Sequence, residues 1–399
     1  MNISLLLKDC VEILDSKRIP LSKEERQKLE KIYPYYGAQE IIDYVDDYLF
    51  DGDYILVAED GNNLKSRKKN IATWVEGKFW VNNHAHILGK KDGFHLKYIY
   101  YLLNAIDVRG YITGSAQPKL NQKNLANIKL SIPSYDQQKK IVQPLDILDK
   151  KISINNSIIS KLEEMAKMIY EYWFLQFDFP NHEGKPYASS GGAMKYSEEL
   201  GREIPTDWEV ENFYKNSLFS LVPTGVEKFS TKRYLATADV VGTNIGEGKQ
   251  VEYETRETRA NMQPRINSVW FAKMKNSTKH LFLNKEMGFL IEKCILSTGF
   301  FGLQCSETSF EYIASTISYP SFEIKKDSLA HGATQEAVNQ DDLQSIKLLI
   351  PNTFVLEKFH ELTKPLYGYI SQMRHENQKL TQLRDWLLPM LMNGQVRVE

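Results

Sequence analysis

The chain has 399 residues, of which 42% are hydrophobic and 25% are charged, and its 50 Lys and Arg residues are balanced by 51 Asp and Glu residues. This length predicts two or three domains that each bury a core of their own, and the composition is that of an ordinary soluble globular protein. The charge balance excludes an overall polycation, but it allows basic residues on one face to contact nucleic acid.

The first residues do not resemble a secretory signal, because Asp9 and Glu12 fall within what would be its apolar region. The sequence also holds no apolar run of about eighteen residues, so we expect no membrane segment and a cytoplasmic protein. The three cysteines are odd in number and far apart, which favours buried thiols over a disulfide framework or a zinc site. They are Cys10, Cys294 and Cys305.

Residues 1–136 predict a first mixed domain. Short apolar or alternating runs such as Tyr54–Ala58 and Lys78–Asn82 are separated by Gly, Asn and Asp, which is typical of an α+β domain rich in strands. Within it, the segment Asn82–His86 (NNHAH) places two imidazoles on one strand face. Two imidazoles can help to hold a metal ion, but no Asp, Glu or Cys pair at ligand spacing accompanies them. Structural histidines are therefore favoured, and no metal site is predicted.

A basic loop follows the turn AEDGNN in this domain. The segment LKSRKKN, from Leu64 to Asn70, carries four cations that can neutralise phosphates, although a solvated surface loop often has the same composition. These candidate DNA contacts are Lys65, Arg67, Lys68 and Lys69.

An internal repeat gives the strongest signal in the sequence. Gly114–Pro133, GSAQPKLNQKNLANIKLSIP, aligns without a gap with Gly332–Pro351, GATQEAVNQDDLQSIKLLIP, at an offset of 218 residues, and ten of the twenty positions are identical. Unrelated segments would share roughly one. Because identical residues in two copies do not explain the reading of different bases, a framework role or a phosphate contact is favoured for this polar loop. Its candidate DNA contacts are Gln117, Lys119, Asn121, Lys123, Gln335 and Asn339.

Two long helices are predicted after the two copies of the repeat, over residues 137–176 and 353–393. Apolar residues recur alternately every four and three positions, which predicts helices of about 38 residues, about 57 Å long, whose apolar stripes need a partner. We expect the two helices to pack on each other, the alternative being that each packs only on its own domain. The predicted seam consists of Ile141, Leu145, Leu148, Ile152, Asn155, Ile159, Leu162, Ala166, Ile169 and Trp173 in the first helix, and Phe359, Thr363, Leu366, Ile370, Met373, Asn377, Leu380, Arg384, Leu387 and Leu391 in the second.

Polar and proline residues add detail to these helices. Asn155 and Asn377 fall on the seam, where a buried Asn fixes the register of two helices at some expense of stability. Pro144 and Pro365 lie near the predicted starts. Either the first turn begins at each proline or each helix is kinked there, and the sequence leaves both possibilities open.

Residues 177–207 predict a linker with little core of its own, because they are rich in Pro, Gly and Ser. Residues 208–352 predict a second mixed domain, which contains the apolar run Val269–Lys273 and differs almost completely from the first. One weak similarity joins FHLKYIYYLL (Phe94–Leu103) to TSFEYIASTI (Thr308–Ile317). Basic residues are spread among Thr, Asn and Gln side chains that can reach base edges. These candidate DNA contacts are Lys228, Lys232, Arg233, Arg256, Arg259, Arg265, Lys273 and Lys275.

Known catalytic signatures do not match the sequence. Gly242–Gln250, GTNIGEGKQ, has one residue too many between its glycines for a phosphate-binding loop and lacks the hydroxyl that holds magnesium. The tetrapeptide with which amino-methyltransferases hold an adenine and a glycine-rich turn for their cofactor are also missing. We therefore expect no catalytic residue and no cofactor in this chain.

The order of these elements suggests how the chain works. Two different domains on one repeated frame indicate that the two halves contact different things, and a long helix in each copy sets a fixed distance between them. Duplex DNA presents half-sites at spacings set by its helical repeat, so a rigid spacer can define the distance between two half-sites. The other class of function that fits is a non-catalytic coiled-coil scaffold whose domains bind proteins.

The sequence resembles the specificity subunits of type I restriction-modification enzymes over essentially its whole length. The resemblance lies in YYGAQEIIDYVDDYLFDGDYILVAEDG, NNHAHIL, GSAQPKLNQ to IPSYDQQKKIV, WFLQFDFPNHEGKPYASSGG to EIPTDWEV, and LRDWLLPMLMNGQV, in this order. It implies an α+β fold in which two strand-rich target-recognition domains are separated by two long antiparallel coiled-coil helices, with a pseudo-twofold internal repeat. Each domain would read one part of a split, asymmetric site in double-stranded DNA.

The resemblance also implies partners. Two methyltransferase subunits with S-adenosylmethionine would dock on the helices, and restriction subunits with motor and nuclease activity would use ATP and magnesium. These ligands would belong to the partner subunits. Only the repeated loops and the helix seams carry over residue by residue, because base-reading residues vary within the family, and the second domain departs most from the family pattern.

Overall fold

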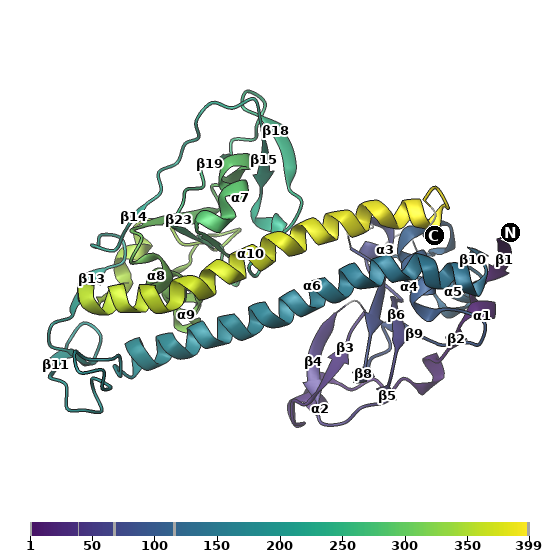
Figure 1. Ribbon diagram of the computed structural model, residues 1–399, viewed down its shortest axis with the longest axis horizontal. Helices are drawn as coiled ribbons and strands as arrows, with labels where there is room; N and C mark the ends of the chain where they lie inside the picture. The colour runs from purple at the N-terminus through teal and green to yellow at the C-terminus, as the bar shows by residue number, and fades with distance from the viewer. Residues whose placement is uncertain (1, 39, 67–68, 115–116, 397–399) are drawn as a thin grey trace. The chain divides into compact units, whose positions relative to one another are not determined.

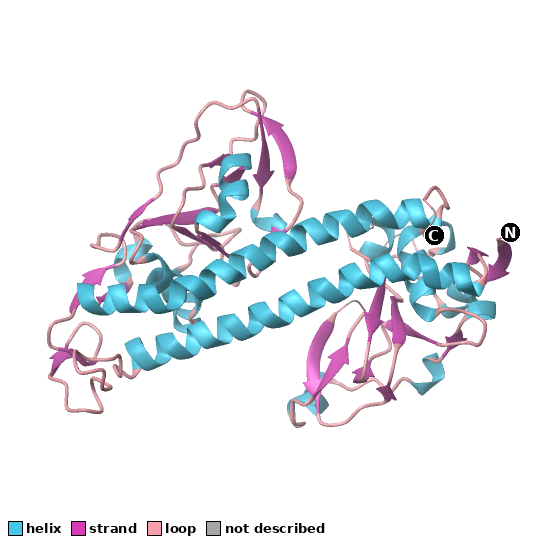
Figure 2. Cartoon of the chain, viewed as in Figure 1, coloured by secondary structure: helices cyan, strands magenta, loops and turns pink. Residues whose placement is uncertain are grey.

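The structure is a computed structural model that describes residues 2–38, 40–66, 69–114 and 117–396. It divides into two compact units, of which unit 1 comprises residues 1–152 and 380–399 and unit 2 comprises residues 153–379. Each unit contains a strand-rich lobe and a part of both long helices (Figures 1 and 2). No helix in the described ranges combines the length and the apolar character that a membrane crossing requires.

Lobe 1, the strand-rich part of unit 1, has two four-stranded sheets within its described residues. The first sheet has the order β2 (Glu12–Ile13), β9 (Ala85–Gly89), β6 (Tyr54–Ala58), β7 (Ala72–Val75), and the second has the order β4 (Ile41–Val45), β3 (Tyr33–Tyr36), β8 (Lys78–Val81), β5 (Phe50–Asp51). A separate pair joins β1 (Ile3–Leu6) to β10 (Lys129–Ile132). The helical segments are α1 (Leu7–Cys10), η1 (Asp15–Lys17), α2 (Lys23–Gln27), α3 (Asn63–Ser66), α4 (Leu96–Ala105), η2 (Arg109–Tyr111) and α5 (Gln122–Ala126).

The core of lobe 1 forms where α4 packs against β6 and β7. Strand β6 is apolar on both faces, and its Ile55 and Val57 are fully buried, because one sheet face meets the helix and the other meets the second sheet. Helix α4 contributes Ile99 and Leu103, which lie four residues apart on one helix face. The run Tyr54–Ala58 was predicted as a strand, and this prediction is confirmed.

Lobe 2, the strand-rich part of unit 2, also has two four-stranded sheets among its described residues. The first is β14 (Phe219–Leu221), β23 (Phe300–Cys305), β20 (Ser268–Ala272), β21 (His280–Leu283), and the second is β18 (Lys249–Glu252), β15 (Thr231–Leu235), β22 (Cys294–Ser297), β19 (Ala260–Met262). Two short pairs are β13 (Glu209–Asn212) with β24 (Lys347–Ile350), and β16 (Val240–Val241) with β17 (Asn244–Ile245). The helical segments are η4 (Thr237–Asp239), η5 (Lys285–Met287), α7 (Gly288–Lys293), α8 (Phe310–Ser318), α9 (Pro320–Leu329) and η6 (Asp342–Ser345).

The two lobes have the same strand order, although their sequences differ almost completely. In the first sheets β2, β9, β6 and β7 correspond to β14, β23, β20 and β21, and in the second β4, β3, β8 and β5 correspond to β18, β15, β22 and β19. In both second sheets the inner strand pairs antiparallel with one neighbour and parallel with the other. Helices α4 and α8 start 214 residues apart, at Leu96 and Phe310, which confirms the weak sequence similarity noted there. The repeat therefore includes the lobes.

The long helices are α6 (Tyr135–Tyr170), which continues into the π-helical turn η3 (Glu171–Leu175), and α10 (Thr353–Met392). Pro144 and Pro365 both lie inside these helices, so neither proline starts the first turn. Of the two possibilities that the sequence left open, a helix start at the proline is therefore wrong.

The predicted seam positions are buried or half-buried at all twenty residues. In unit 1, Asp149 of α6 accepts a hydrogen bond from Arg384 of α10 at 2.9 Å. In unit 2, Asn155 Nδ2 donates to Asn377 Oδ1 at 2.9 Å, and the rings of Trp173 and Phe359 lie 5.6 Å apart. The helices thus pack on each other, antiparallel, within each unit (Figure 1). They also pack on the lobes, since Leu145 belongs to the core of lobe 1 and Phe359 to that of lobe 2.

Residues 177–207 have more structure than the predicted linker with little core. They contain the hairpin of β11 (Met194–Ser197) and β12 (Arg202–Pro205). Phe179 is 3% exposed and stacks on Tyr187 and Trp208, with ring centroids 4.7 and 5.1 Å away. The expectation was wrong because it weighed Pro, Gly and Ser and overlooked the aromatic residues, which join the core of unit 2.

All three cysteines are buried free thiols, as expected. Burial raises the pKa of Cys10 to about 11, with a further contribution from the charge of Asp9. These thiols act as small apolar residues of the cores.

Candidate nucleic-acid interface

The repeated loops of the two lobes contain the same glycine turn. Gly114 has a φ of +83°, and a Cβ atom at this position would lie 2.2 Å from the carbonyl oxygen of Gln117. Gly332 has a φ of +138°, and its Cβ would lie 2.5 Å from the carbonyl oxygen of Gln335. A side chain fits neither position, so the identity of both glycines follows from the backbone. Gln117 and Gln335 lie exposed on these turns.

The loop of lobe 1 is attached by its backbone to the end of β6. Thr113 and Lys119 exchange two amide hydrogen bonds of 2.8 Å, and the Leu120 amide donates to the Glu59 carbonyl at 2.8 Å. Lobe 2 repeats this arrangement at the end of β20. His331 and Ala337 exchange bonds of 3.2 and 3.0 Å, and the Val338 amide donates to the Lys273 carbonyl at 3.0 Å.

The recurring asparagines of the loops cap the turns that follow them. The Asn121 side chain accepts from the Asn124 amide at 2.9 Å and starts α5. The Asn339 side chain accepts from the amides of Asp341 and Asp342 at 2.8 and 3.1 Å. The favoured framework role therefore accounts for these asparagines and for the two glycines, and a DNA contact by Asn121 or Asn339 stays a prediction.

The basic segment of lobe 1 lies beside the repeated loop. Lys65 Nζ donates to the Gly114 carbonyl at 3.1 Å, and Lys119 Nζ pairs with Glu59 at 3.1 Å. Arg67 and Lys68 lie outside the residues that the structure describes. The exposed polar and basic residues of this region are Lys65, Lys69, Gln117, Lys119 and Lys123.

The two histidines of NNHAH have protein partners. His86 is 1% exposed, and its Nδ1 contacts Asp15 at 2.6 Å while its Nε2 contacts the Leu120 carbonyl at 2.7 Å. His84 Nδ1 contacts Asp60 at 2.8 Å. Because both nitrogens of His86 are engaged, this residue is structural, as favoured from the sequence, and it connects β9 to the repeated loop.

The carboxyl of Asp15 is the centre of this buried network. Burial raises its pKa, but the hydrogen bond and charge of His86, the amide of Ile87 and the charge of Arg18 outweigh burial and hold the pKa below its usual value. The carboxylate therefore stays ionised in the interior, where three groups stabilise its charge.

In lobe 2 the predicted basic residues do not form one cluster. Lys232 and Arg233 are adjacent in β15 and therefore point to opposite faces of the second sheet. Lys232 Nζ lies 5.6 Å from the ring centre of Phe229 and 3.4 Å from Gln263 Oε1. Arg233 Nε instead lies 3.4 Å from the buried thiol of Cys294.

Arg256 lies on the same side of the sheet as Lys232. Its guanidinium stacks on Tyr253 at 4.0 Å and contacts Asn261 Oδ1 at 3.5 Å, and Tyr253 in turn packs edge to face on Phe229 at 5.5 Å. We call Phe229, Lys232, Tyr253, Arg256, Asn261 and Gln263 the lobe 2 cation–aromatic surface. It combines cations, amides and aromatic rings, which are the groups that contact phosphates and bases.

The corresponding sheet of lobe 1 carries a similar cluster that the sequence analysis missed. Tyr33 and Tyr48 pack edge to face with centroids 5.2 Å apart, and Lys78 Nζ lies 4.3 Å from the ring centre of Tyr48 and 5.9 Å from that of Tyr33. We call these three residues the lobe 1 cation–aromatic surface. Basic residues interleaved with aromatic ones were the available signal, but Lys78 is an isolated basic residue next to apolar ones in the sequence.

The remaining basic candidates of lobe 2 have other surroundings. Lys273 is packed over the Phe301 ring at 4.2 Å, and burial lowers its pKa. Lys275 pairs with Glu336 of the repeated loop at 2.8 Å. Both residues therefore have a structural role within lobe 2. Lys228, Arg259 and Arg265 are exposed.

Comparison with known proteins connects this arrangement to a family. A family model described as the type I restriction modification DNA specificity domain matches residues 5–164. A putative type I restriction enzyme specificity subunit of Haemophilus influenzae is 33% identical over 142 residues, which are 36% of this chain and 36% of that protein. The type I restriction enzyme MjaIX specificity subunit of Methanocaldococcus jannaschii is 24% identical over 339 residues, which are 77% of this chain and 71% of that protein.

A solved structure extends the likeness in fold to both lobes. The S subunit of a type I restriction-modification system from M. genitalium gives a TM-score of 0.55 at 14% identity and covers 98% of this chain and 96% of that one. The match to the Haemophilus relative spans only about a third of that protein, 36% of its length. The family model, the relatives and the fold agree: residues 5–164 match the type I restriction modification DNA specificity domain, and most of the chain is similar to type I restriction enzyme specificity subunits.

Proposed function

We propose that this chain recognises a bipartite, asymmetric site in double-stranded DNA, with each lobe reading one half. The observation that carries the proposal is the repeated fold with unlike surfaces: both lobes have the same strand order and the same glycine turn, but different side chains at corresponding places. A shared frame keeps the geometry, and different side chains give each half a different DNA sequence to read.

The two cation–aromatic surfaces are the best supported DNA contacts. They lie on corresponding sheets, and each combines an edge-to-face aromatic pair with a Lys ammonium near a ring. In lobe 2, Gln263 contacts Lys232, and Arg256 donates to Asn261 and to the carbonyls of Tyr253 and Ala260, so both cations are held in place; one N–H each on Nη1 and Nη2 of Arg256 would be left for phosphate. The basic loop with Lys65, Lys69 and Lys119 would add phosphate contacts in lobe 1.

Partner subunits would dock on the long helices, since exposed apolar residues recur there. Met165 and Met168 of α6 are 45% and 54% exposed, and Leu383 and Trp386 of α10, at the same positions 218 residues later, are 44% and 57% exposed. Repeated apolar surfaces are suited to two copies of one partner. We assign them to two methyltransferase subunits that bring S-adenosylmethionine, in a cytoplasmic complex that restriction subunits with ATP and magnesium would join. This chain would contribute no catalytic group.

The DNA contacts can be tested on the chain assembled with its methyltransferase partner. We expect Lys232→Ala and Arg256→Ala to weaken binding to a duplex that carries the methylated site and to reduce the slope of log affinity against log salt by about 1 for each lost phosphate contact. Lys185→Ala in the segment between the lobes is the matched control, because Lys185 pairs only with Glu183 among the described residues. An unchanged affinity and slope in both lobe 2 variants would remove this surface from the interface.

The second candidate function is a scaffold whose lobes bind proteins. It would also explain a repeated frame with exposed apolar residues. The same experiment separates the two, because a protein-binding scaffold would show no salt-dependent affinity for duplex DNA.

A further inference from the structure

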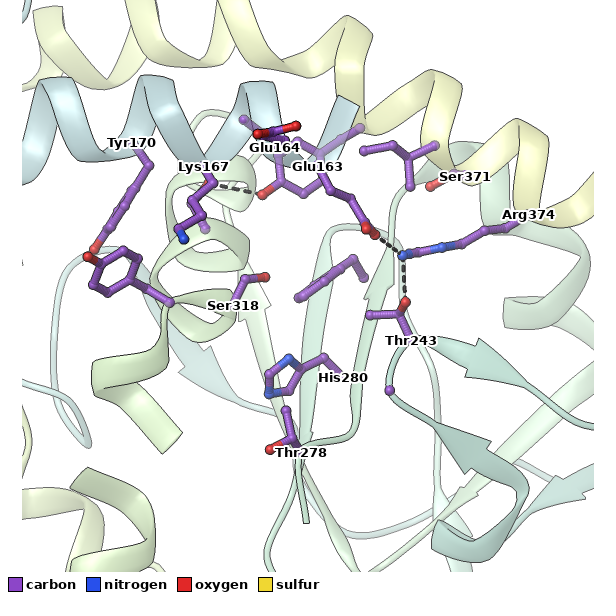
Figure 3. Close-up of a pocket in the computed structure, with 17 residues that line it drawn as sticks. Glu163, Glu164, Lys167, Tyr170, Thr243, Thr278, His280, Ser318, Ser371 and Arg374 are labelled. Carbon is purple, nitrogen blue, oxygen red and sulfur yellow. Dashed lines mark hydrogen bonds and ion pairs between the residues drawn. The ribbon is translucent and has the colours of Figure 1, made fainter. Parts of the chain in front are cut away.

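Unit 2 contains a cavity of about 410 Å³ between the two long helices and lobe 2 (Figure 3). Its walls are largely apolar and aromatic, with Phe282 of β21, Tyr170 of α6 and Tyr367 of α10 among them. Protein interiors are close-packed, so a hollow of this size forgoes many contacts unless another molecule fills it. Its volume is in the range of pockets that hold small organic molecules.

Unit 1 has different side chains at the corresponding place. There, Tyr101 of α4 and Arg384 of α10 both donate to the carboxylate of Asp149, at 2.6 and 2.9 Å. The position that corresponds to Tyr101 at the 214-residue offset is Ser315, and the position that corresponds to Arg384 at the 218-residue offset is Ala166. Both of these small residues line the cavity. Two large side chains meet Asp149 in one copy of the fold, whereas two small ones lie beside Tyr367, which is the counterpart of Asp149 at the 218-residue offset, in the other.

Polar groups without protein partners face the cavity. Ser371 is 4% exposed, and within the described residues its hydroxyl has no hydrogen-bond partner. Arg374 uses only its Nη2 atom for hydrogen bonds, which it donates to Glu163 and to the Thr243 hydroxyl, the latter at 2.6 Å. Nε and Nη1 of Arg374 have no acceptor in the described part of the chain. The Ser371 hydroxyl and the unused N–H groups of Arg374 can donate hydrogen bonds to acceptor atoms of a molecule in the cavity.

The charges around the cavity decide what kind of ligand fits. Arg374 is paired with Glu163 (Figure 3), Lys167 is paired with Glu171 at 3.8 Å, and Glu164 is exposed. A ligand with a net charge would gain no buried, unpaired counter-ion and would lose its hydration. Aromatic walls favour a flat ring. We propose that this cavity binds a neutral, planar aromatic compound whose acceptor atoms meet Ser371 and Arg374.

The test uses the full chain and three probes of different chemistry. Caffeine is a flat neutral ring system with acceptors only, benzamide is a small neutral aromatic amide, and cyclohexylamine is a non-planar cation. We expect saturable binding of caffeine or benzamide, with a rise in the melting temperature, and no binding of cyclohexylamine, measured by ligand-observed NMR and thermal shift. Binding of the cation alone, or of none of the three, would overturn the proposal.

Variants at Ser371 test whether the probes bind in this cavity. Ser371→Leu fills the cavity and should weaken binding more than tenfold, whereas Ser160→Leu, at an exposed position of α6, should leave it unchanged. Ser371→Ala removes only the unused hydroxyl and should weaken binding several-fold. If Ser371→Leu does not fold, Ser371→Ala decides the outcome. Equal affinity of the wild-type chain and a folded Ser371 variant would overturn the assignment. The proposal does not depend on DNA recognition, so these results are independent of the proposed function.

Discussion

Asn155 of α6 and Asn377 of α10 meet at a seam position in unit 2, where the Asn155 amide donates to the Asn377 carbonyl oxygen at 2.9 Å and Asn155 is 1% exposed. The Asn377 amide donates in turn to Asn156 at 2.8 Å. A shift of one helix along the other would break both bonds and leave the buried Asn155 amide unpaired. The pair therefore selects one register of the two helices, at some expense of stability.

The Asn155 pair predicts opposite effects of a single and a double substitution. Asn155→Leu should lower the free energy of unfolding by about 1–3 kcal/mol, because it removes a partner of the Asn377 amide group. The double variant Asn155→Leu with Asn377→Leu should regain most of that loss, since two apolar residues pack at the seam and only Glu376, which accepts from Asn155 at 2.7 Å, loses a partner. Urea unfolding of the three chains measures both. A double variant less stable than the single one would contradict this reading.

The glycine turns predict a position-dependent effect of alanine. Gly114→Ala and Gly332→Ala should each destabilise the chain by about 1–3 kcal/mol, because their φ values are positive and a Cβ would overlap a carbonyl oxygen. Gly110→Ala is the matched control in lobe 1, since a Cβ there meets nothing within 4 Å. Thermal unfolding compares the three. Equal effects at Gly110 and Gly114 would mean that the turn is not needed.

The buried carboxylate of Asp15 predicts a dependence of stability on pH. Its pKa is lowered in the folded state, so the stabilisation is present above the unfolded-state pKa near 3.8 and is lost as the pH falls through the lower folded-state value. Asp15→Asn should therefore be less stable than wild type at pH 7 and should lose less stability on acidification. Asp92→Asn, at an exposed position, is the control. Parallel pH profiles of unfolding for wild type and Asp15→Asn would refute the role of this carboxylate.

The exposed apolar residues on the long helices predict that substitutions there remove the two methyltransferase subunits one at a time. Met168→Asp should remove one methyltransferase subunit, Trp386→Asp should remove the other, and the double variant should bind neither, because each substitution places a charge in one apolar interface. Ser160→Asp, at an exposed position of α6 about two helical turns before Met168, should bind both. Native mass spectrometry of the assembled complexes gives the stoichiometry. Full assembly of the double variant would place the docking surfaces elsewhere.

Much of the frame follows from the sequence, and the surfaces do not. The heptad spacing of apolar residues predicted the long helices and the contact between Asn155 and Asn377. The ten identical residues of the repeat predicted the common loop, because a glycine turn allows few backbone structures. The common strand order of the two lobes could not be predicted, because many different sequences can alternate buried and exposed side chains along a strand. The burial of Phe179 was not predicted, because the composition of residues 177–207 is dominated by Pro, Gly and Ser and gives little weight to a single aromatic residue. The partners of Lys232 and Arg256 come from other strands, which only the tertiary structure brings together.

The central claim, that each lobe reads its own half of the DNA site, is tested most directly by exchanging lobe 2, residues 208–352, for that of another specificity subunit. Methylated sites in cells that also contain the methyltransferase subunit are then mapped by sequencing. The account predicts that one half-site changes while the other half-site and the spacing between them stay the same. A change in both half-sites, or in neither, would contradict it.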